Sequence, residues 1–221
     1  DAVYVSLPNS MHHEWTLKAL KAGKHVLCEK PLASNAKQAS EMFDTAASCN
    51  RLLVEAFMYR SHPQTHAIIQ KIREGAIGEV RLVRTSFCYF THRIADNIRF
   101  DADLAGGALM DIGCYCIDFA RLMIGKEPVH VHAVGHLHES GVDDLVSAAM
   151  QFEGGALATM TCGMQVHADN AAYICGSEGY IHVPVPWKPP VSHATFTISQ
   201  STPPKRDKGA KASKPKTMTL Q

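Results

Sequence analysis

The sequence predicts an α/β protein in which part of a doubly wound parallel sheet is followed by an α+β domain with a large, mostly antiparallel open sheet. Near the N-terminus, short apolar runs alternate with helical runs over short links, the pattern of parallel strands joined by right-handed crossovers. After a later helix several strand patterns follow one another directly, as in antiparallel sheets. A length of 221 residues, 46% of them hydrophobic, leaves room for two small domains.

The first part, residues 1–60, is predicted to be the C-terminal portion of a dinucleotide-binding (Rossmann) domain. Gly23 stands where a helix ends, and Asn35 and Gln38 have the spacing of a capping box. The chain opens in mid-strand and contains no G-x-G-x-x-G, so we expect about 70 residues of this domain to precede it. The expected elements are a strand at 2–7, a helix at 10–22, a strand at 25–28, a helix at 35–49 and a strand at 52–57.

The second part, residues 61–221, is predicted to be a substrate and dimerisation domain that is incomplete at its C-terminus. Glu153-Gly154-Gly155 has the composition of a hairpin turn between two strands. The stretch from Thr202 onward is rich in Lys and Pro and is interpreted as a solvated loop. The expected elements are helices at 63–74 and 110–124 and strands at 80–90, 129–138, 145–152, 156–164, 171–175 and 180–185.

Charge and composition exclude several classes of protein. Before Thr202 the acidic residues outnumber the basic ones, which argues against a nucleic-acid partner. No run of about 18 apolar residues exists, so no membrane span is expected. The seven cysteines include no C-x-x-C pair, which favours reduced thiols and a cytoplasmic location.

Two loops are expected to meet at one edge of the parallel sheet. "SLPNS" and "CEKP" each follow a strand, and ligands of open α/β sheets bind beyond the carboxyl ends of the strands. This places Asn9, His12, Glu29 and Lys30 around one crevice. Lys30 would there supply a positive charge that stabilises a developing oxyanion. The alternative is a surface Lys30 paired with Glu29 on a loop.

A second group of polar residues lies in "GGALMDIGCYCID". Asp111 and Tyr115 are spaced four residues apart and Asp118 follows, which on an α-helix places them on one face. The carboxylate of Asp111 could then accept a hydrogen bond from Tyr115, and a phenol whose pKa is lowered by a nearby Lys is a plausible general acid. The alternative is that Asp111 caps the helix and Tyr115 is a core aromatic residue.

Histidines raise the question of a metal site. His130, His132, His136 and His138 share one face of a predicted strand, but at about 3.3 Å per residue they span too far to converge on one ion. His62 and His66 have helical spacing without the glutamate of an H-E-x-x-H motif. No metal is therefore expected, and a metal-dependent hydrolase is the weakest of the functional alternatives.

The motifs P-N-x-x-H, G-K-H-V-x-x-E-K-P and G-G-x-x-x-D-x-G-x-Y together resemble those of the Gfo/Idh/MocA family of oxidoreductases. With a tyrosine at position 115, the sequence resembles the branch of the family that contains trans-dihydrodiol dehydrogenase, NADP-dependent xylose dehydrogenase and glucose–fructose oxidoreductase. This resemblance implies that Lys30, Tyr115 and Asp111 are catalytic and that the peptide bond before Pro31 is cis. It also implies that the residues lining the cofactor are Pro8, Asn9, His12, Glu29, Lys30, Pro31 and Arg60.

The function that the resemblance implies is hydride transfer between a nicotinamide cofactor and a CH–OH group. The expected cofactor is NADP, with NAD as the alternative. The substrate would be a xylose-like sugar or a cyclic trans-dihydrodiol, and the protein a homodimer. In the oxidation direction Tyr115 would take the hydroxyl proton while Lys30 holds the oxygen. The alternative is a non-catalytic binding or regulatory protein, or an isoform with a truncated dehydrogenase fold, because the sequence contains no G-x-G-x-x-G.

Overall fold

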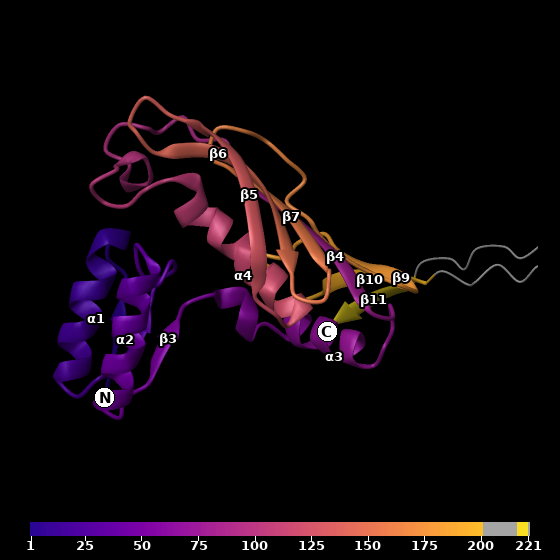
Figure 1. Ribbon diagram of the computed structural model, residues 1–221, viewed down its shortest axis with the longest axis horizontal. Helices are drawn as coiled ribbons and strands as arrows, with labels where there is room; N and C mark the ends of the chain where they lie inside the picture. Colours follow the sequence, from indigo (N-terminus) through magenta and orange to yellow (C-terminus); the bar gives the residue numbers. More distant parts are fainter. Residues whose placement is uncertain (201–215, 221) are drawn as a thin grey trace, which may run out of the picture.

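A three-stranded parallel sheet with two helices forms the first part of the chain in this computed structural model, which describes residues 1–200 and 216–220. The strands lie in the order β1-β2-β3 and the links between them contain the two helices (Figure 1). The elements are β1 (Ala2–Val5), a 3-10 turn (Asn9–Met11), α1 (His12–Lys21), β2 (His25–Cys28), α2 (Ala36–Ser48) and β3 (Leu53–Glu55).

The two helices pack against each other and against the same side of this small sheet. Leu17 and Leu20 of α1 and Met42 of α2 are buried against the apolar side chains of the strands. The predicted cap of the second helix is confirmed, because Asn35 Oδ1 accepts a hydrogen bond of 3.0 Å from the backbone N–H of Gln38. A side chain that satisfies a free N–H fixes the start of a helix.

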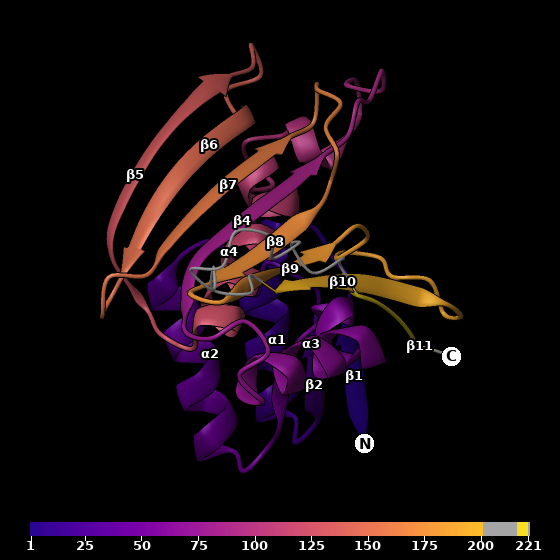
Figure 2. The same cartoon turned by 90° about the vertical axis from the view of Figure 1, so that its right-hand side faces the viewer.

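A large sheet of eight strands dominates the second part (Figure 2). Its order is β11-β10-β9-β8-β4-β7-β6-β5, and among the pairs described in this sheet only β4 with β7 is parallel. The strands are β4 (Val80–Cys88), β5 (Pro128–Leu137), β6 (Asp143–Phe152), β7 (Leu157–Gly163), β8 (Ala172–Gly176), β9 (Gly179–Val183), β10 (Ala194–Gln200) and β11 (Lys216–Leu220). The predicted fold class is therefore confirmed.

Helix α4 (Cys114–Ile124) lies across one face of the large sheet, over β4 and β7. Its residues Phe119 and Met123 join the main apolar core together with Val83, Phe152 and other buried strand residues. Helix α3 (Pro63–Arg73) follows the 3-10 turn Met58–Ser61 and contacts β10. The opposite face of the sheet carries no helix in the part of the chain that the structure describes (Figure 2).

The structure corrects three sequence-based expectations. The helix expected at 110–124 begins with a π-helical turn, Leu109–Gly113, before α4 continues as an α-helix. Strand β10 was not predicted, and β11 forms at 216–220 where a loop was expected, because it pairs with β10 along its whole length. The remainder of the predicted loop, 202–215, lies outside the described residues. No helix in the described ranges is long and apolar enough to cross a membrane.

Candidate active site

Lys30 follows β2, on a loop that reaches from the small sheet to the start of α4. The Lys30–Pro31 peptide bond is cis. The ammonium Nζ donates to the backbone oxygen of Asp111 at 2.5 Å and lies 3.1 Å from Asp111 Oδ1. The side chain is only 15% exposed, so this contact joins the two parts of the chain through a largely buried ion pair.

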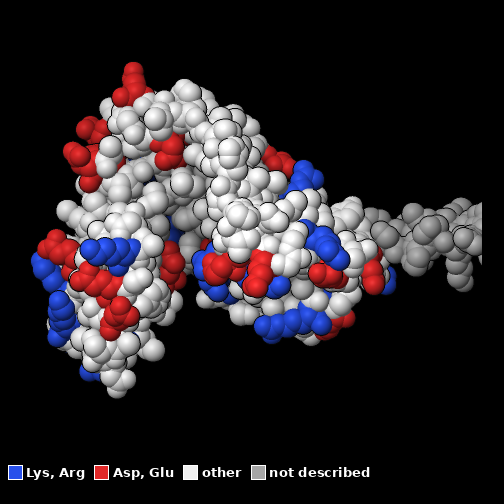
Figure 3. Space-filling model, viewed as in Figure 1, with Lys and Arg blue, Asp and Glu red and all other residues white. Residues whose placement is uncertain are grey.

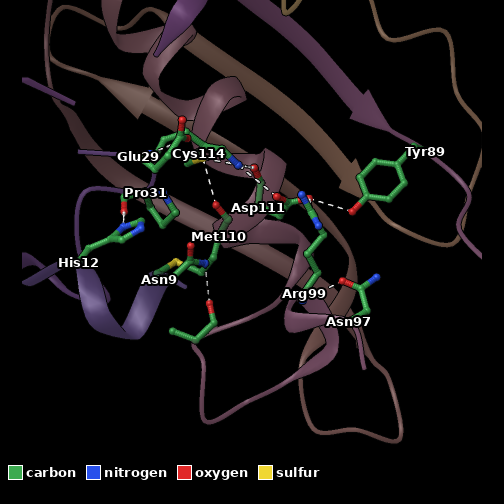
Figure 4. Close-up of polar contacts among 12 residues, drawn as sticks. Asn9, His12, Glu29, Pro31, Tyr89, Asn97, Arg99, Met110, Asp111 and Cys114 are labelled. Atoms are coloured by element: carbon green, nitrogen blue, oxygen red, sulfur yellow. Dashed lines mark hydrogen bonds and ion pairs between the residues drawn. The ribbon is translucent and has the colours of Figure 1, made fainter. Parts of the chain in front are cut away.

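The carboxylate of Asp111 is the centre of a hydrogen-bonded group. Besides Lys30, it accepts from the hydroxyl of Tyr89 at 2.8 Å and from Arg99 Nε at 3.0 Å, both on Oδ2 (Figure 4). Burial alone would raise the pKa of Asp111, but the charges of Lys30 and Arg99 outweigh it, and the pKa lies below its usual value. Asp111 is therefore an anion with a cation on each side.

Two sequence-based expectations for Asp111 are wrong. Its carboxylate accepts no hydrogen bond from Tyr115 among the described contacts, because the π-helical turn at Leu109–Gly113 interrupts the α-helical spacing and Lys30, Tyr89 and Arg99 occupy it instead. Nor does Asp111 cap the helix. That place is taken by Asp143, whose Oδ2 accepts from the backbone N–H of Leu109 at 2.7 Å.

Tyr115 lies in the first turn of α4 with its ring buried among other aromatic rings. The ring centroids of Phe57 and Phe87 lie 5.1 and 5.4 Å from that of Tyr115, both in edge-on contact. Lys30 Nζ lies 5.4 Å from the same ring centroid. Lys30 and Tyr115, distant in sequence, are therefore neighbours in space.

The protonation of Tyr115 differs from the sequence-based expectation. Burial raises the pKa of its phenol, and Cys114, Glu29 and Asp111 raise it further. The pKa is raised although the ammonium of Lys30 lies 5.4 Å from the centroid of the ring. Tyr115 is therefore a neutral phenol, and its hydroxyl has no hydrogen-bond partner among the described residues. Such a group can donate a proton to a ligand.

Two hollows meet at this group of side chains. The larger is a cleft of about 790 Å³ lined by Tyr115, Phe87, Tyr89 and residues of the loops around them. The smaller, about 320 Å³, lies beyond the carboxyl ends of β1 and β2 and is lined by Tyr4, Ser6, Asn9 and others. Both are bounded by Glu29, Lys30, Ile98, Arg99 and Asp111. Figure 3 shows the molecule hollowed between the part containing α1 and α2 and the part containing the large sheet.

The loops at the carboxyl ends of β1 and β2 contain most of the remaining predicted residues. Asn9 Nδ2 donates to the backbone oxygen of Ala105 at 2.9 Å, which attaches the β1 loop to the second part of the chain. Glu29 accepts a hydrogen bond from the Tyr4 hydroxyl and, at 3.3 Å, from the backbone N–H of Lys30. Pro8 precedes the 3-10 turn, and its backbone oxygen accepts from Met11 N. Asn9 and Glu29 thus face the smaller hollow, as expected.

His12 ties the two loops together. Its Nδ1 lies 2.8 Å from the backbone oxygen of Pro31, its Nε2 lies 2.8 Å from that of Leu7, and the residue is only 1% exposed (Figure 4). Both ring nitrogens are thus occupied by the backbone. His12 holds the loops that bound the smaller hollow and offers neither nitrogen to a ligand.

Among the described contacts, Arg60 does not touch the residues around the smaller hollow but pairs with Asp118. Its Nη1 donates to Asp118 Oδ1 at 3.0 Å, and the other carboxylate oxygen of Asp118 accepts from the Tyr59 hydroxyl. Asp118 therefore faces the junction between the two parts of the chain, while Asp111 faces the hollows.

Tyr89 and Arg99 are site residues that the sequence analysis did not identify. Tyr89 follows β4, and Arg99 lies in a short 3-10 turn whose start is capped by Asn97 Oδ1 at 3.1 Å. No motif marks either residue. The histidines of β5 show no metal arrangement. His136 Nδ1 lies 2.7 Å from Asp144, and the described residues contain no group of three potential ligands.

Comparison with known proteins decides the family. Residues 1–57 match the oxidoreductase family with an NAD-binding Rossmann fold, and residues 65–182 match the GFO/IDH/MocA C-terminal domain. The chain belongs to the Gfo/Idh/MocA oxidoreductases. This confirms the family resemblance inferred from the sequence motifs.

Individual relatives within the Gfo/Idh/MocA family agree. The chain is 38% identical over 191 residues to trans-1,2-dihydrobenzene-1,2-diol dehydrogenase of Xenopus tropicalis, covering 86% of this chain and 57% of the relative. It is 41% identical over 159 residues to an NADP-dependent D-xylose 1-dehydrogenase of Haloferax volcanii, covering 72% and 48%. It thus spans roughly half the length of these relatives.

A solved structure of the family has the same fold. The 3-ketoreductase of Actinomadura kijaniata, in complex with NADP and TDP-benzene, superimposes with a TM-score of 0.84 at 34% identity, covering all of this chain and 65% of that one. Structures of the same reductase include a tyrosine-to-phenylalanine variant and a lysine-to-alanine variant.

Proposed function

We propose that this oxidoreductase transfers a hydride between NADP and a CH–OH group of a sugar or a cyclic trans-dihydrodiol. The observation that carries the proposal is the meeting of Lys30, Asp111 and Tyr115 at the junction of two hollows, with Lys30 Nζ 5.4 Å from the Tyr115 ring centroid. The relatives named above act on such substrates, and the structural neighbour binds NADP. In that neighbour the lysine and tyrosine chosen for replacement are separated by nearly the same number of residues as Lys30 and Tyr115.

The smaller hollow fits the nicotinamide end of such a cofactor. It lies beyond the carboxyl ends of parallel strands, where dinucleotides bind in this class of fold. It is lined by hydroxyl and amide groups of Tyr4, Ser6 and Asn9, which suit ribose hydroxyls and a carboxamide. When bound, the cofactor supplies or receives the hydride. His12 would maintain the shape of this hollow without touching the cofactor.

Lys30 would stabilise charge on the substrate oxygen. Its ammonium is already oriented by two oxygens of Asp111, so little reorganisation is needed when an oxygen of the substrate becomes negative. Asp111 itself would act by holding Lys30, and Tyr89 and Arg99 by holding Asp111. We therefore assign Asp111 a positioning role.

Tyr115 would exchange the proton. Because burial keeps its phenol neutral, it is in the form that donates a proton to a carbonyl oxygen during reduction. In the oxidation direction the same oxygen would first have to lose its proton to accept that of the hydroxyl.

We also propose that the chain divides into domains at residue 60, between the two family matches, and that it forms a homodimer. The face of the large sheet away from α4 carries no helix among the described residues, and a second copy would cover it. Light scattering would test the dimer. A monomer at micromolar concentration would contradict it.

The experiment that tests the function is a titration of the protein with NADPH, followed by the fluorescence of the nicotinamide, together with turnover assays on D-xylose and a trans-dihydrodiol. Saturable binding and oxidation or reduction of the cofactor would support the proposal. Binding of a sugar or diol without any binding of NADPH would instead indicate the non-catalytic alternative.

A further inference from the structure

We propose that the larger cleft takes a sugar carrying an anionic group, a phosphate or a carboxylate, and that Arg93 and Lys188 bind that group. The inference rests on the proposed function, since it concerns the substrate of the same site. It adds the residues that would recognise the end of the substrate remote from the reacting carbon.

The larger cleft is lined by four basic and three acidic residues. The basic residues are Lys30, Arg93, Arg99 and Lys188, and the acidic ones are Glu29, Asp96 and Asp111. Asp111 pairs with Lys30 and Arg99, so these two cations are compensated. Arg93 and Lys188 form no ion pair with any described residue, and Asp96 lies beyond ion-pair distance of both. An anionic ligand group would complement these two free cations.

Hydrogen bonds hold the backbone of Arg93, so the start of its side chain is fixed at the cleft. The backbone N–H of Arg93 donates to Thr91 Oγ1 at 3.2 Å, and its backbone oxygen accepts from Asn97 Nδ2 at 2.8 Å. Gln165 Nε2 in turn donates to the backbone oxygen of Thr91 at 2.6 Å. The guanidinium group itself takes part in none of these bonds and stays available to a ligand.

Lys188 is held in a similar way by its neighbour Trp187. The indole ring is 3% exposed and stacks on Phe87 with 5.5 Å between ring centroids. Its Nε1 donates to the backbone oxygen of Ser86 at 2.8 Å. Since Phe87 also contacts the ring of Tyr115, the start of the Lys188 side chain is placed relative to the proposed proton donor.

The position of the two cations assigns the orientation of the substrate. Arg93 and Lys188 are exposed, whereas Tyr115 and Lys30 lie at the buried side of the same cleft. A volume of about 790 Å³ exceeds what a pentose alone would fill. The reacting CH–OH would therefore point inward, and the anionic group would remain at the cleft mouth between Arg93 and Lys188.

The test compares sugars that differ only in charge, using calorimetric titration of the protein at low salt. The matched probes are D-glucose 6-phosphate with D-glucose, and D-glucuronate with D-glucose. An exposed ion pair contributes about two- to threefold in affinity, so a charged probe that contacts both Arg93 and Lys188 should bind about fivefold more tightly than its neutral counterpart. This preference should shrink as salt is added.

Substitutions test which residues cause the preference for the charged probe. Arg93→Gln and Lys188→Gln should each reduce it about two- to threefold, and the double variant should abolish it. Arg73→Gln and Lys37→Gln remove exposed cations on α3 and α2 that also lack ion pairs, and should leave it unchanged. Preference within either pair of probes supports the inference and identifies the anionic group as phosphate or carboxylate.

Equal affinities within both pairs, or a preference that survives in the double variant, would overturn the inference. Its failure differs from a failure of the proposed function. If NADPH binds and D-xylose is turned over while charge has no effect, only the anionic substrate is wrong. If the charge preference is present but NADPH does not bind, the proposed hydride transfer is wrong and the anion site stands.

Discussion

The ammonium of Lys30 lies 3.1 Å from a carboxylate oxygen of Asp111, and this ion pair connects the loop after β2 with the π-helical turn before α4. Arg99 and Tyr89 occupy the other oxygen of the same carboxylate. The orientation of Lys30 therefore depends on residues from two other segments of the chain. This dependence can be tested through pH.

Asp111→Asn should lower the free energy of unfolding by about 3 kcal/mol at neutral pH, because two cations lose a largely buried anionic partner. The pKa of Asp111 is lowered in the folded state, so its stabilisation is present above the ordinary value near 4 and is lost as the pH falls through the lowered value. The difference between wild type and variant should therefore shrink below about pH 4 in urea unfolding curves. Asp44→Asn, an exposed acid on α2 without an ion pair, should show no such effect.

Tyr115→Phe should reduce turnover of the complete enzyme about 100-fold or more, because the substituted ring packs equally well but carries no proton. Stability at neutral pH should change little, since the hydroxyl has no hydrogen-bond partner among the described residues. Steady-state kinetics and urea unfolding of the same preparation would separate the two effects. Tyr180→Phe, which removes an exposed hydroxyl on β9, is the matched control. Unchanged turnover in Tyr115→Phe would exclude it from the reaction.

The protonation of Tyr115 predicts a further effect at alkaline pH. Its pKa is raised in the folded protein, so the folded state retains a proton that the unfolded state loses above about pH 10. The stability that Tyr115 contributes is thus present below that pH and is lost as the pH rises toward its folded pKa. Tyr115→Phe should weaken the decline of unfolding free energy between about pH 9 and 11. An identical decline in both proteins would show that the phenol ionises as it does in water.

Local patterns explain why much of this site was predictable. The E-K-P motif ends a strand, and the cap at Asn35 follows a rule that involves only a few adjacent residues. The local pattern left the roles of Lys30 and Asp111 open, and the resemblance of the surrounding motifs to a known family is what predicts that both residues are catalytic. The contacts of Tyr89 and Arg99 with Asp111 depend on the path of the chain between β4 and α4, and nothing in their immediate neighbours indicates it.

The parts that the sequence analysis missed have physical reasons. Strand β10 does show alternation, with Ala194, Phe196 and Ile198 buried, but it follows a proline-rich stretch and was overlooked. Strand β11 contains five residues and owes its conformation to pairing with β10. The π-helical turn at Leu109–Gly113, which contains Asp111, cannot be predicted from helical periodicity.

His12→Phe should destabilise the protein by about 1–3 kcal/mol, because the buried backbone oxygen that accepts from the ring, that of Leu7 or of Pro31, would be left without its donor. Affinity for NADPH should fall as well, since these loops bound the smaller hollow. Chemical denaturation and NADPH fluorescence measure the two effects. His66→Phe, at an exposed position on α3, should leave both unchanged. A stable His12→Phe variant with normal NADPH binding would show that the two contacts are dispensable.

Gly107 controls the entry into the helical segment that carries Asp111 and Tyr115. Its φ is +114°, and a Cβ there would lie 2.3 Å from Oδ1 of Asp143, the residue whose Oδ2 caps Leu109. Gly107→Ala should therefore lower the free energy of unfolding by roughly 2–4 kcal/mol, because it combines an unfavourable φ with a steric clash and the loss of the helix cap. Gly141→Ala is the matched control, because Gly141 also has a positive φ, +87°, but no atom lies within 4 Å of the added Cβ. It should cost only about 1 kcal/mol. Equal losses of unfolding free energy in both variants would show that the conformation of the backbone, and not the contact with Asp143, determines the cost. Since Asp111 follows this turn, Gly107→Ala should also weaken the dependence of the unfolding free energy on acid pH, whereas Gly141→Ala should not.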